Sequence, residues 1–330
     1  MTACVLELRA RRRQCSLWLV AVIAVASALV SGLLVGGARS AGGSSGLIAF
    51  TRPDGIYVMR PDGTGVRPLR RGSAASQALQ LDWSPDGSRI AFESRGAIWL
   101  LGADGEGLAR LVARGGAWGS AHSPTWSPDG RVLAFSAERA REIWVVDADG
   151  SNAHRLLRLA KLEAEDIGVG EIDWSPDGRR LAFTGHGGWL AWVYVVNTNG
   201  TNLRRLTERG WAWATNPRWS PDGRRIAFEQ WARNPTNIYS DRDSEIYVMT
   251  LDSGSQAQLT RNREYDGTPV WSPDGRRIAF VRFGHGCAEC PAAARGGAEE
   301  IFVMNADGTA MKRLTDNRVG EASPAWKPVA

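Results

Sequence analysis

Histidine and cysteine are scarce in this chain of 330 residues, which has four of each. Four cysteines in a chain of this length exclude the small disulfide-rich class of protein. The histidines form neither an H-x-H nor an H-E-x-x-H pattern, which argues against the common zinc-enzyme motifs. We therefore expect no catalytic residue, no metal and no other cofactor.

A concentrated positive charge is also missing from most of the chain. The formal net charge is +5, but the first 45 residues hold five arginines and one glutamate. The remainder is therefore close to neutral. Nucleic-acid binding needs a basic stripe that follows the phosphates, so we expect no nucleic-acid partner.

The N-terminal segment has the layout of an export signal. Residues 14–38 carry no charge and follow a group of arginines, as in a secretory signal peptide. Residues 38–40 offer a small-x-small cleavage site, whereas the length of the apolar run also suits an uncleaved anchor. We therefore expect residues 1–40 to be a signal peptide or membrane anchor, 41–46 a linker, and the rest to be exported. Its location would be periplasmic, cell-surface or secreted, with membrane contact only through residues 14–38 if they are retained.

One sequence repeat dominates the rest of the chain. The string WSPDG begins at Trp83, Trp126, Trp174, Trp219 and Trp271, and a degenerate copy begins at Trp326. Each full copy precedes a short apolar segment ending in Ala-Phe, a second apolar segment, a Gly-containing turn and a last segment with a leucine. Proline and glycine in S-P-D-G suit a tight turn between two strands. The repeat therefore predicts four antiparallel strands, A to D, with the tryptophan near the end of strand A.

A period of 43 to 55 residues between successive repeat tryptophans is the size of a propeller blade. The region starts with a strand B at residues 47–50 and ends with a strand A at residues 321–326. Together these two fragments complete one blade. We therefore predict an all-β fold over residues 47–330: a six-bladed β-propeller with four antiparallel strands per blade, closed by the C-terminal strand. The repeat tryptophans would fill the space between blades.

The WSPDG-xx-[IL]AF … DG … LT pattern resembles the TolB-like β-propeller family of bacterial exported proteins. The resemblance covers residues 46–330 and implies a propeller fold. It corresponds to the propeller half only, without the N-terminal α/β domain that TolB carries. It is far less specific about function.

Strand parity places the B–C and D–A connections on one face of the propeller, and these connections vary in length. The extra tryptophans fall in them: Trp118, Trp189, Trp211, Trp213 and Trp231. They form either an aromatic docking surface or loop packing onto the ring.

The third residue before each repeat tryptophan is polar in all six repeats. We expect this position, with three neighbours, to ring the mouth of the central channel, as a ligand site or as a hydrogen-bonding belt around water. The set is Gln80, His122, Ser123, Glu171, Asn216, Asp266, Thr268, Glu321 and Ser323.

Two smaller groups carry alternative hypotheses. His122, His186 and His285 fall on the same face and would allow a metal-dependent lyase or hydrolase if they converged. Cys287 and Cys290 lie in the longest insertion, where an exported protein favours a disulfide, with a metal site beside His285 or a redox role as alternatives.

The favoured function is a non-enzymatic, monomeric binding propeller that engages a protein, peptide or envelope glycan through the B–C and D–A face.

Overall fold

The computed structural model describes residues 46–115, 117–137, 142–158, 167–187, 190–208, 213–231, 244–262, 264–285, 296–317 and 319–329. The chain divides into residues 1–42 and residues 43–330. The predicted signal or anchor lies outside the described residues. Among those described, no helix has both the length and the apolar character needed to span a bilayer.

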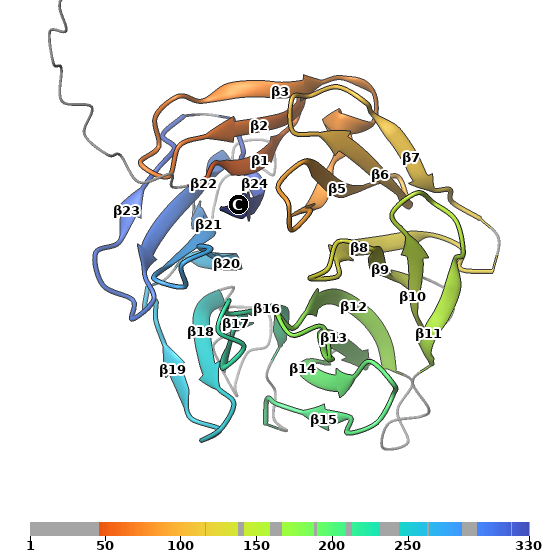
Figure 1. The fold of residues 1–330 in the computed structure, drawn as a ribbon. Helices are drawn as coiled ribbons and strands as arrows, with labels where there is room; N and C mark the ends of the chain where they lie inside the picture. Colours follow the sequence, from red (N-terminus) through yellow and green to blue (C-terminus); the bar gives the residue numbers. More distant parts are fainter. Residues whose placement is uncertain are drawn as a thin grey trace, which may run out of the picture. The chain divides into compact units, whose positions relative to one another are not determined.

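Six four-stranded antiparallel sheets surround a central axis (Figure 1). This confirms the predicted six-bladed propeller. The innermost strands, A, are β24 (Ala322–Trp326), β4 (Leu79–Trp83), β8 (Ala121–Trp126), β12 (Ile167–Trp174), β16 (Ala214–Trp219) and β20 (Tyr265–Trp271). Strands B are β1 (Ile48–Arg52), β5 (Arg89–Ser94), β9 (Val132–Ala137), β13 (Arg180–Gly187), β17 (Arg225–Trp231) and β21 (Arg277–His285).

Strands C are β2 (Gly55–Met59), β6 (Ala97–Gly102), β10 (Glu142–Asp147), β14 (Leu190–Asn197), β18 (Ser244–Thr250) and β22 (Gly296–Asn305). The outermost strands, D, are β3 (Arg67–Arg71), β7 (Ala109–Val112), β11 (His154–Arg158), β15 (Arg204–Arg205), β19 (Gln256–Gln258) and β23 (Lys312–Arg313). Blade 1 is β24-β1-β2-β3, and blades 2 to 6 follow in chain order. A 3₁₀ helix, η1 (Ser73–Gln77), lies in the connection before β4.

The WSPDG string makes the A–B hairpin, as the turn chemistry predicts. In blade 2 the amide of Gly87 donates to the carbonyl of Ser84 (2.7 Å), and Gly87 has a φ of 65°. The Ser84 hydroxyl donates to Oδ1 of Asp86 (2.6 Å), and the same oxygen accepts the amide of Ser88 (3.0 Å). Serine and aspartate therefore fix the turn from both sides, while glycine supplies the left-handed backbone.

The repeat tryptophans pack between blades. Trp126 is 4% exposed and lies in a cluster with Ile98 of blade 2 and Phe135 of blade 3. The first residue of strand B in the preceding blade covers its ring, because the Arg89 guanidinium lies 4.7 Å from the ring centroid. Equivalent stacks join Arg180 to Trp219, Arg225 to Trp271 and Arg277 to Trp326. Cation–π contacts therefore add to the apolar packing at these four junctions.

The two ends of the described propeller share one sheet. Strand β24 pairs antiparallel with β1, with Trp326 opposite Ile48, and Lys327 donates its amide to the Leu47 carbonyl (2.7 Å). Strand β24 also contacts the inner strands β4 and β20 of the neighbouring blades. The ring is therefore closed by β-strand pairing, as predicted.

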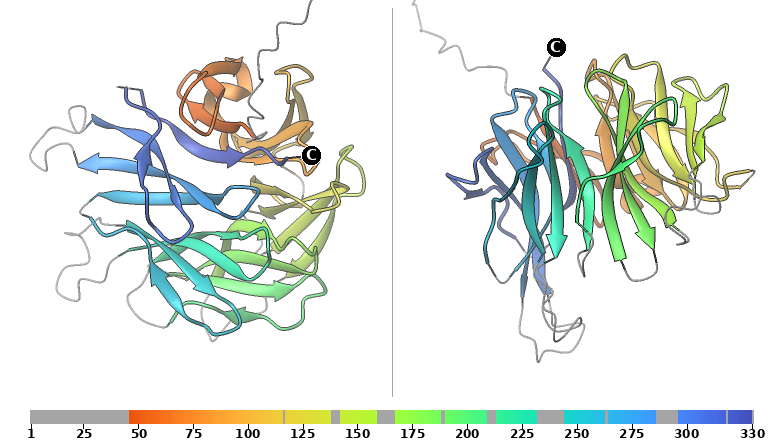
Figure 2. Two further views of the ribbon diagram at one scale, coloured as in Figure 1. Left: turned by 60° about the vertical axis from the view of Figure 1, so that its left-hand side comes forward. Right: turned by 90° about the horizontal axis from the view of Figure 1, so that it is seen from below.

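The two faces differ in construction. We call the face with the A–B and C–D turns the hairpin face, and the face with the B–C and D–A connections the loop face. Figure 2 shows the blades edge-on, with the strands running between the two faces. The predicted long insertions are the connections between β17 and β18 and between β21 and β22, and most of their residues fall outside the described ranges.

Candidate functional site

Every inner strand has a β-bulge at the polar position found three residues before its repeat tryptophan. The pairing with strand B shifts register there in all six blades. Five of these residues have a left-handed backbone with φ between 48° and 53°: Gln80, Ser123, Asn216, Thr268 and Ser323. Such a conformation costs a non-glycine residue roughly 1–2 kcal/mol. Blade 4 has Glu171 at this position, and it is not among the positive-φ residues.

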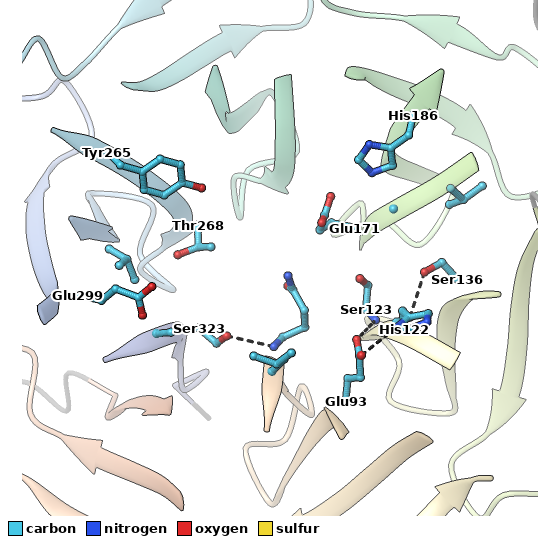
Figure 3. Close-up of a pocket in the computed structure, with 16 residues that line it drawn as sticks. Glu93, His122, Ser123, Ser136, Glu171, His186, Tyr265, Thr268, Glu299 and Ser323 are labelled. Carbon is cyan, nitrogen blue, oxygen red and sulfur yellow. Dashed lines mark hydrogen bonds and ion pairs between the residues drawn. The ribbon is translucent and has the colours of Figure 1, made fainter. Parts of the chain in front are cut away.

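A pocket of about 450 Å³ opens at the loop-face end of the channel (Figure 3). It is lined by six of the residues expected at the channel mouth: Gln80, His122, Ser123, Glu171, Thr268 and Ser323. The lining also includes residues that the sequence analysis did not assign to the mouth, among them Glu93, Ser136, His186, Tyr265 and Glu299. Three of the lining residues, Glu93, Ser136 and Val281, directly follow the Ala-Phe pair of strand B, so the repeat itself contained that signal.

Carboxylates from strand B hold the neighbouring bulges in place. Oε1 of Glu93 lies 2.8 Å from Nδ1 of His122, and Oε2 accepts the amide of Ser123 (3.4 Å). In the opposite half of the ring, Oε2 of Glu229 accepts the amide of Thr268 (2.9 Å). A carboxylate on one blade thus satisfies the bulge amide of the next blade, which helps to offset the strain of the left-handed residue.

Glu229 is the centre of a buried network next to the pocket. Its Oε1 accepts hydrogen bonds from the hydroxyls of Thr215 (2.6 Å) and Tyr265 (3.0 Å). Burial raises the pKa of Glu229 above its usual value, the hydrogen bonds oppose that increase, and the charge of Glu171 adds to it. Burial is also the largest cause that raises the pKa of the Tyr265 phenol. The charges of Glu229, Glu171 and Glu299 raise it further. The negative charges of three carboxylates therefore act on one phenol at the pocket wall.

Three residues expected at the channel mouth lie outside the pocket lining. Asp266 is fully buried and forms a bidentate pair with Arg282 (2.6 and 2.8 Å). Glu321 is fully buried too, and pairs with Arg52 (2.8 Å). In both blades an asparagine four residues earlier donates to the same carboxylate. Asp266 and Glu321 therefore clamp their D–A connections. Asn216 lies in the bulge of blade 5 and is 8% exposed.

Below the pocket, three charged side chains occupy the position directly before the repeat tryptophan. Nη1 of Arg218 lies 3.6 Å from Oδ1 of Asp173, and Nη2 donates to Oε1 of Gln80 in the pocket lining (3.3 Å). Asp82 and Asp173 each accept the amide of the next blade's repeat tryptophan at 2.7 Å. Burial raises the pKa of Asp82 to about 6 and of Asp173 to about 7, against the attraction of Arg218. We call Asp82, Asp173 and Arg218 the channel triad.

The described loop tryptophans divide into two groups. Trp118 packs edge-on against Phe135 and Trp144 of blade 3, at centroid distances of 5.9 and 5.5 Å. Trp213 instead lies 5.8 Å from Trp231 and 6.0 Å from the His186 ring, which lines the pocket. The aromatic group of His186, Trp213 and Trp231 is thus continuous with the pocket, whereas Trp118 packs onto blade 3. Trp189 and Trp211 lie outside the described residues.

The side chains of two of the three histidines in the enzyme hypothesis lie within the described residues. His122 and His186 both line the pocket. The side chain of His285 and both Cys287 and Cys290 lie outside the described residues. Within the described part of the chain, no group of three or more His, Cys, Asp or Glu side chains has the geometry to hold a metal ion.

Comparison with known proteins identifies the family. A model of the TolB beta propeller domain matches residues 51–243, more than half of the chain. The chain belongs to the TolB beta propeller family. This TolB-type propeller is similar to the crystal structure of TolB from Acinetobacter baumannii, with a TM-score of 0.66 and 22% identity. That alignment covers 86% of this chain and 67% of the other, and shows a shared fold.

Curated relatives match shorter segments. The Tol-Pal system protein TolB of Anaeromyxobacter sp. (strain K) is 30% identical over 88 residues, which is 27% of this chain and 18% of that protein. The uncharacterised peptidase YuxL of Bacillus subtilis (strain 168) is 28% identical over 85 residues, 26% of this chain and 11% of that protein. The TolB-type propeller therefore spans about a quarter or less of the curated relatives it matches.

Proposed function

We propose that this TolB-type propeller is an exported binding module that engages a protein or peptide segment through its loop face, without catalysing a reaction. The observation that carries the proposal is the pocket at the channel mouth. It is lined by residues held in a left-handed backbone conformation by carboxylates of the neighbouring blade. Strained, over-determined positions of this kind concentrate at binding sites.

The surroundings of the pocket support contact with a macromolecule. Leu79 lines the pocket and is 51% exposed, which is unusual for a large apolar side chain in this fold. Val319, in the D–A connection of blade 1, is 42% exposed. Trp213 and Trp231 add aromatic surface beside His186, and aromatic residues are frequent anchors of interfaces.

A protein partner is favoured over an envelope glycan by the family. One relative carries the name Tol-Pal system protein TolB, which places that relative in a protein system. Export of this chain rests on the charge-free segment at residues 14–38 and the arginines that precede it. A monomeric propeller is consistent with a ring that closes on itself.

Site-specific photo-crosslinking in producing cells tests the proposal. A photoreactive residue replaces Leu79 or Val319 on the loop face, and Glu106 or Asp149 in C–D turns of the hairpin face serves as the matched control. All four positions are exposed. We expect discrete crosslinked products from the loop-face positions alone. Equal products from both faces, or products from the C–D turns only, would contradict the proposal.

The alternative of a metal-dependent enzyme rests on His122, His186 and His285. It is tested by metal analysis of the purified chain together with a His122→Ala, His186→Ala variant. Stoichiometric Mn, Zn or Fe that is lost in the variant would favour the enzyme. Trace metal unaffected by the substitutions would favour the binding module.

A further inference from the structure

The pocket at the channel mouth carries an uncompensated negative charge that points to its ligand. We propose that it receives the guanidinium group of an arginine side chain from a protein partner. This inference rests on the proposed function and specifies the chemistry of the partner. It depends on two carboxylates, Glu171 of blade 4 and Glu299 of blade 6, which face the pocket in Figure 3.

Neither carboxylate is neutralised within the described part of the chain. Glu171 and Glu299 form no side-chain hydrogen bond or ion pair with a described residue, unlike Glu93, which contacts His122 at 2.8 Å. Oε2 of Glu171 is shielded from solvent and has no hydrogen-bond partner. Burial alone raises the pKa of Glu299, with no compensating contact. A poorly solvated, unpaired carboxylate is costly, and an entering cation would relieve that cost.

The described residues that line the pocket include no lysine or arginine. Arg218 reaches the lining through Gln80, and its guanidinium is already paired with Asp173. Both carboxylates line the same pocket as Tyr265, and their charges raise the pKa of its phenol. No lysine or arginine of the described lining therefore balances these two charges.

The arrangement suits an extended organic cation better than a metal ion. A metal ion needs several ligands at 2.0–2.6 Å, and the described residues form no such group. A guanidinium has five N–H donors in a plane and can bridge carboxylates on different walls. Thr268 adds an acceptor, since its Oγ1 is buried without a hydrogen-bond partner. The ring of His186, next to Trp213, offers a flat surface for stacking.

Peptide binding to the full-length chain tests this inference. The probes are the pentapeptides Ac-GGRGG-NH₂, Ac-GGKGG-NH₂ and a citrulline version that keeps the shape of arginine without its charge. Titration is followed by NMR on the wild type, on Glu171→Gln with Glu299→Gln, and on Glu106→Gln. Glu106 is a matched control because its carboxylate is 79% exposed on the hairpin face. Thermal unfolding verifies that each variant is folded, and Glu299→Gln alone serves if the double variant is not.

We expect the arginine peptide to bind at least tenfold more tightly than the citrulline and lysine peptides. We expect the pocket variant to lose at least tenfold of that affinity and Glu106→Gln to retain it. Equal binding of arginine and citrulline, equal binding of arginine and lysine, or full affinity in the folded pocket variant would overturn the inference. Loop-face crosslinks from Leu79 would survive such a result, so failure of the arginine site is distinguishable from failure of the proposed function.

Discussion

Arg218 of blade 5 forms an ion pair with Asp173 of blade 4 inside the channel, with 3.6 Å between Nη1 and Oδ1. The same guanidinium donates to Gln80 of blade 2 and lowers the pKa of Asp82 in that blade. One side chain thus connects three blades and lies directly below the pocket. The channel triad holds two carboxylates for one guanidinium, so its stability depends both on that arginine and on pH.

Removal of the arginine is the first prediction. Arg218→Met leaves two partly buried carboxylates without their cation, which is expected to lower the free energy of unfolding by about 3 kcal/mol at neutral pH. Urea denaturation measures the effect, and Arg224→Met, an exposed arginine in the same hairpin, is the control. The loss should be smaller at pH 5, where the aspartates can be protonated. A loss below 1 kcal/mol at neutral pH would contradict a structural role for the triad.

The second prediction concerns pH. Asp82 and Asp173 have folded-state pKa values of about 6 and about 7, against 3.8 for the ordinary carboxyl. The folded state therefore binds more protons than the unfolded state between about pH 4 and 7. Their contribution to stability is complete below pH 4 and is lost as the pH rises through 6 and 7.

The variant Asp82→Asn, Asp173→Asn isolates this contribution. The difference in unfolding free energy between wild type and variant should shift against the wild type by on the order of 6 kcal/mol from pH 4 to pH 8, because both carboxyl pKa values lie above 3.8 in the folded state. Comparison with the variant at each pH removes the opposite effect of the hairpin aspartates, such as Asp86, whose pKa is lowered to about 2 by hydrogen bonds from Ser84 and Ser88. A difference that stays constant with pH would show that the triad does not titrate in this range.

Ring closure gives the third prediction. Deletion of residues 321–330 removes β24, which pairs with β1 and contains the buried Trp326. The shortened chain is expected to lose cooperative unfolding and to associate through the exposed strand edge. Chemical denaturation and gel filtration measure both effects. Deletion of residues 329–330 alone is the control, because Val329 is 49% exposed. A shortened chain that unfolds like the parent would refute closure by β24.

The bulge residues give the fourth prediction. Thr268 combines a β-branched side chain with a φ of 48° and a buried hydroxyl that has no partner. Thr268→Gly removes both costs, although glycine also increases the entropy of the unfolded chain, which partly cancels the benefit. We expect the free energy of unfolding to rise by up to about 1 kcal/mol. Thr268→Val keeps the branching and should be destabilising by comparison. Urea denaturation measures the free energy of unfolding of both variants. If Thr268→Val is as stable as Thr268→Gly or more stable, backbone strain at this position is contradicted.

The propeller architecture of this protein can be predicted from its amino-acid sequence alone. WSPDG specifies each A–B hairpin, the repeat count gives the blades, and the two terminal fragments form the closing blade. These features are local or periodic in the sequence, so they can be predicted before the three-dimensional structure is known. Even the stack of Arg89 on Trp126 follows from the repeat, because the basic residue occupies the same place in most copies.

The set of polar side chains that share the pocket, in contrast, depends on the tertiary structure. Asp266 and Glu321 were grouped with the channel mouth by their positions, yet arginines from strand B hold both of them in buried ion pairs. Glu299 joined the pocket from strand C, where no repeat feature marked it. Arg218 and Gln80 are 138 positions apart in the chain. A local pattern fixes how each blade folds, but contacts across the channel depend on how six blades are brought around one axis.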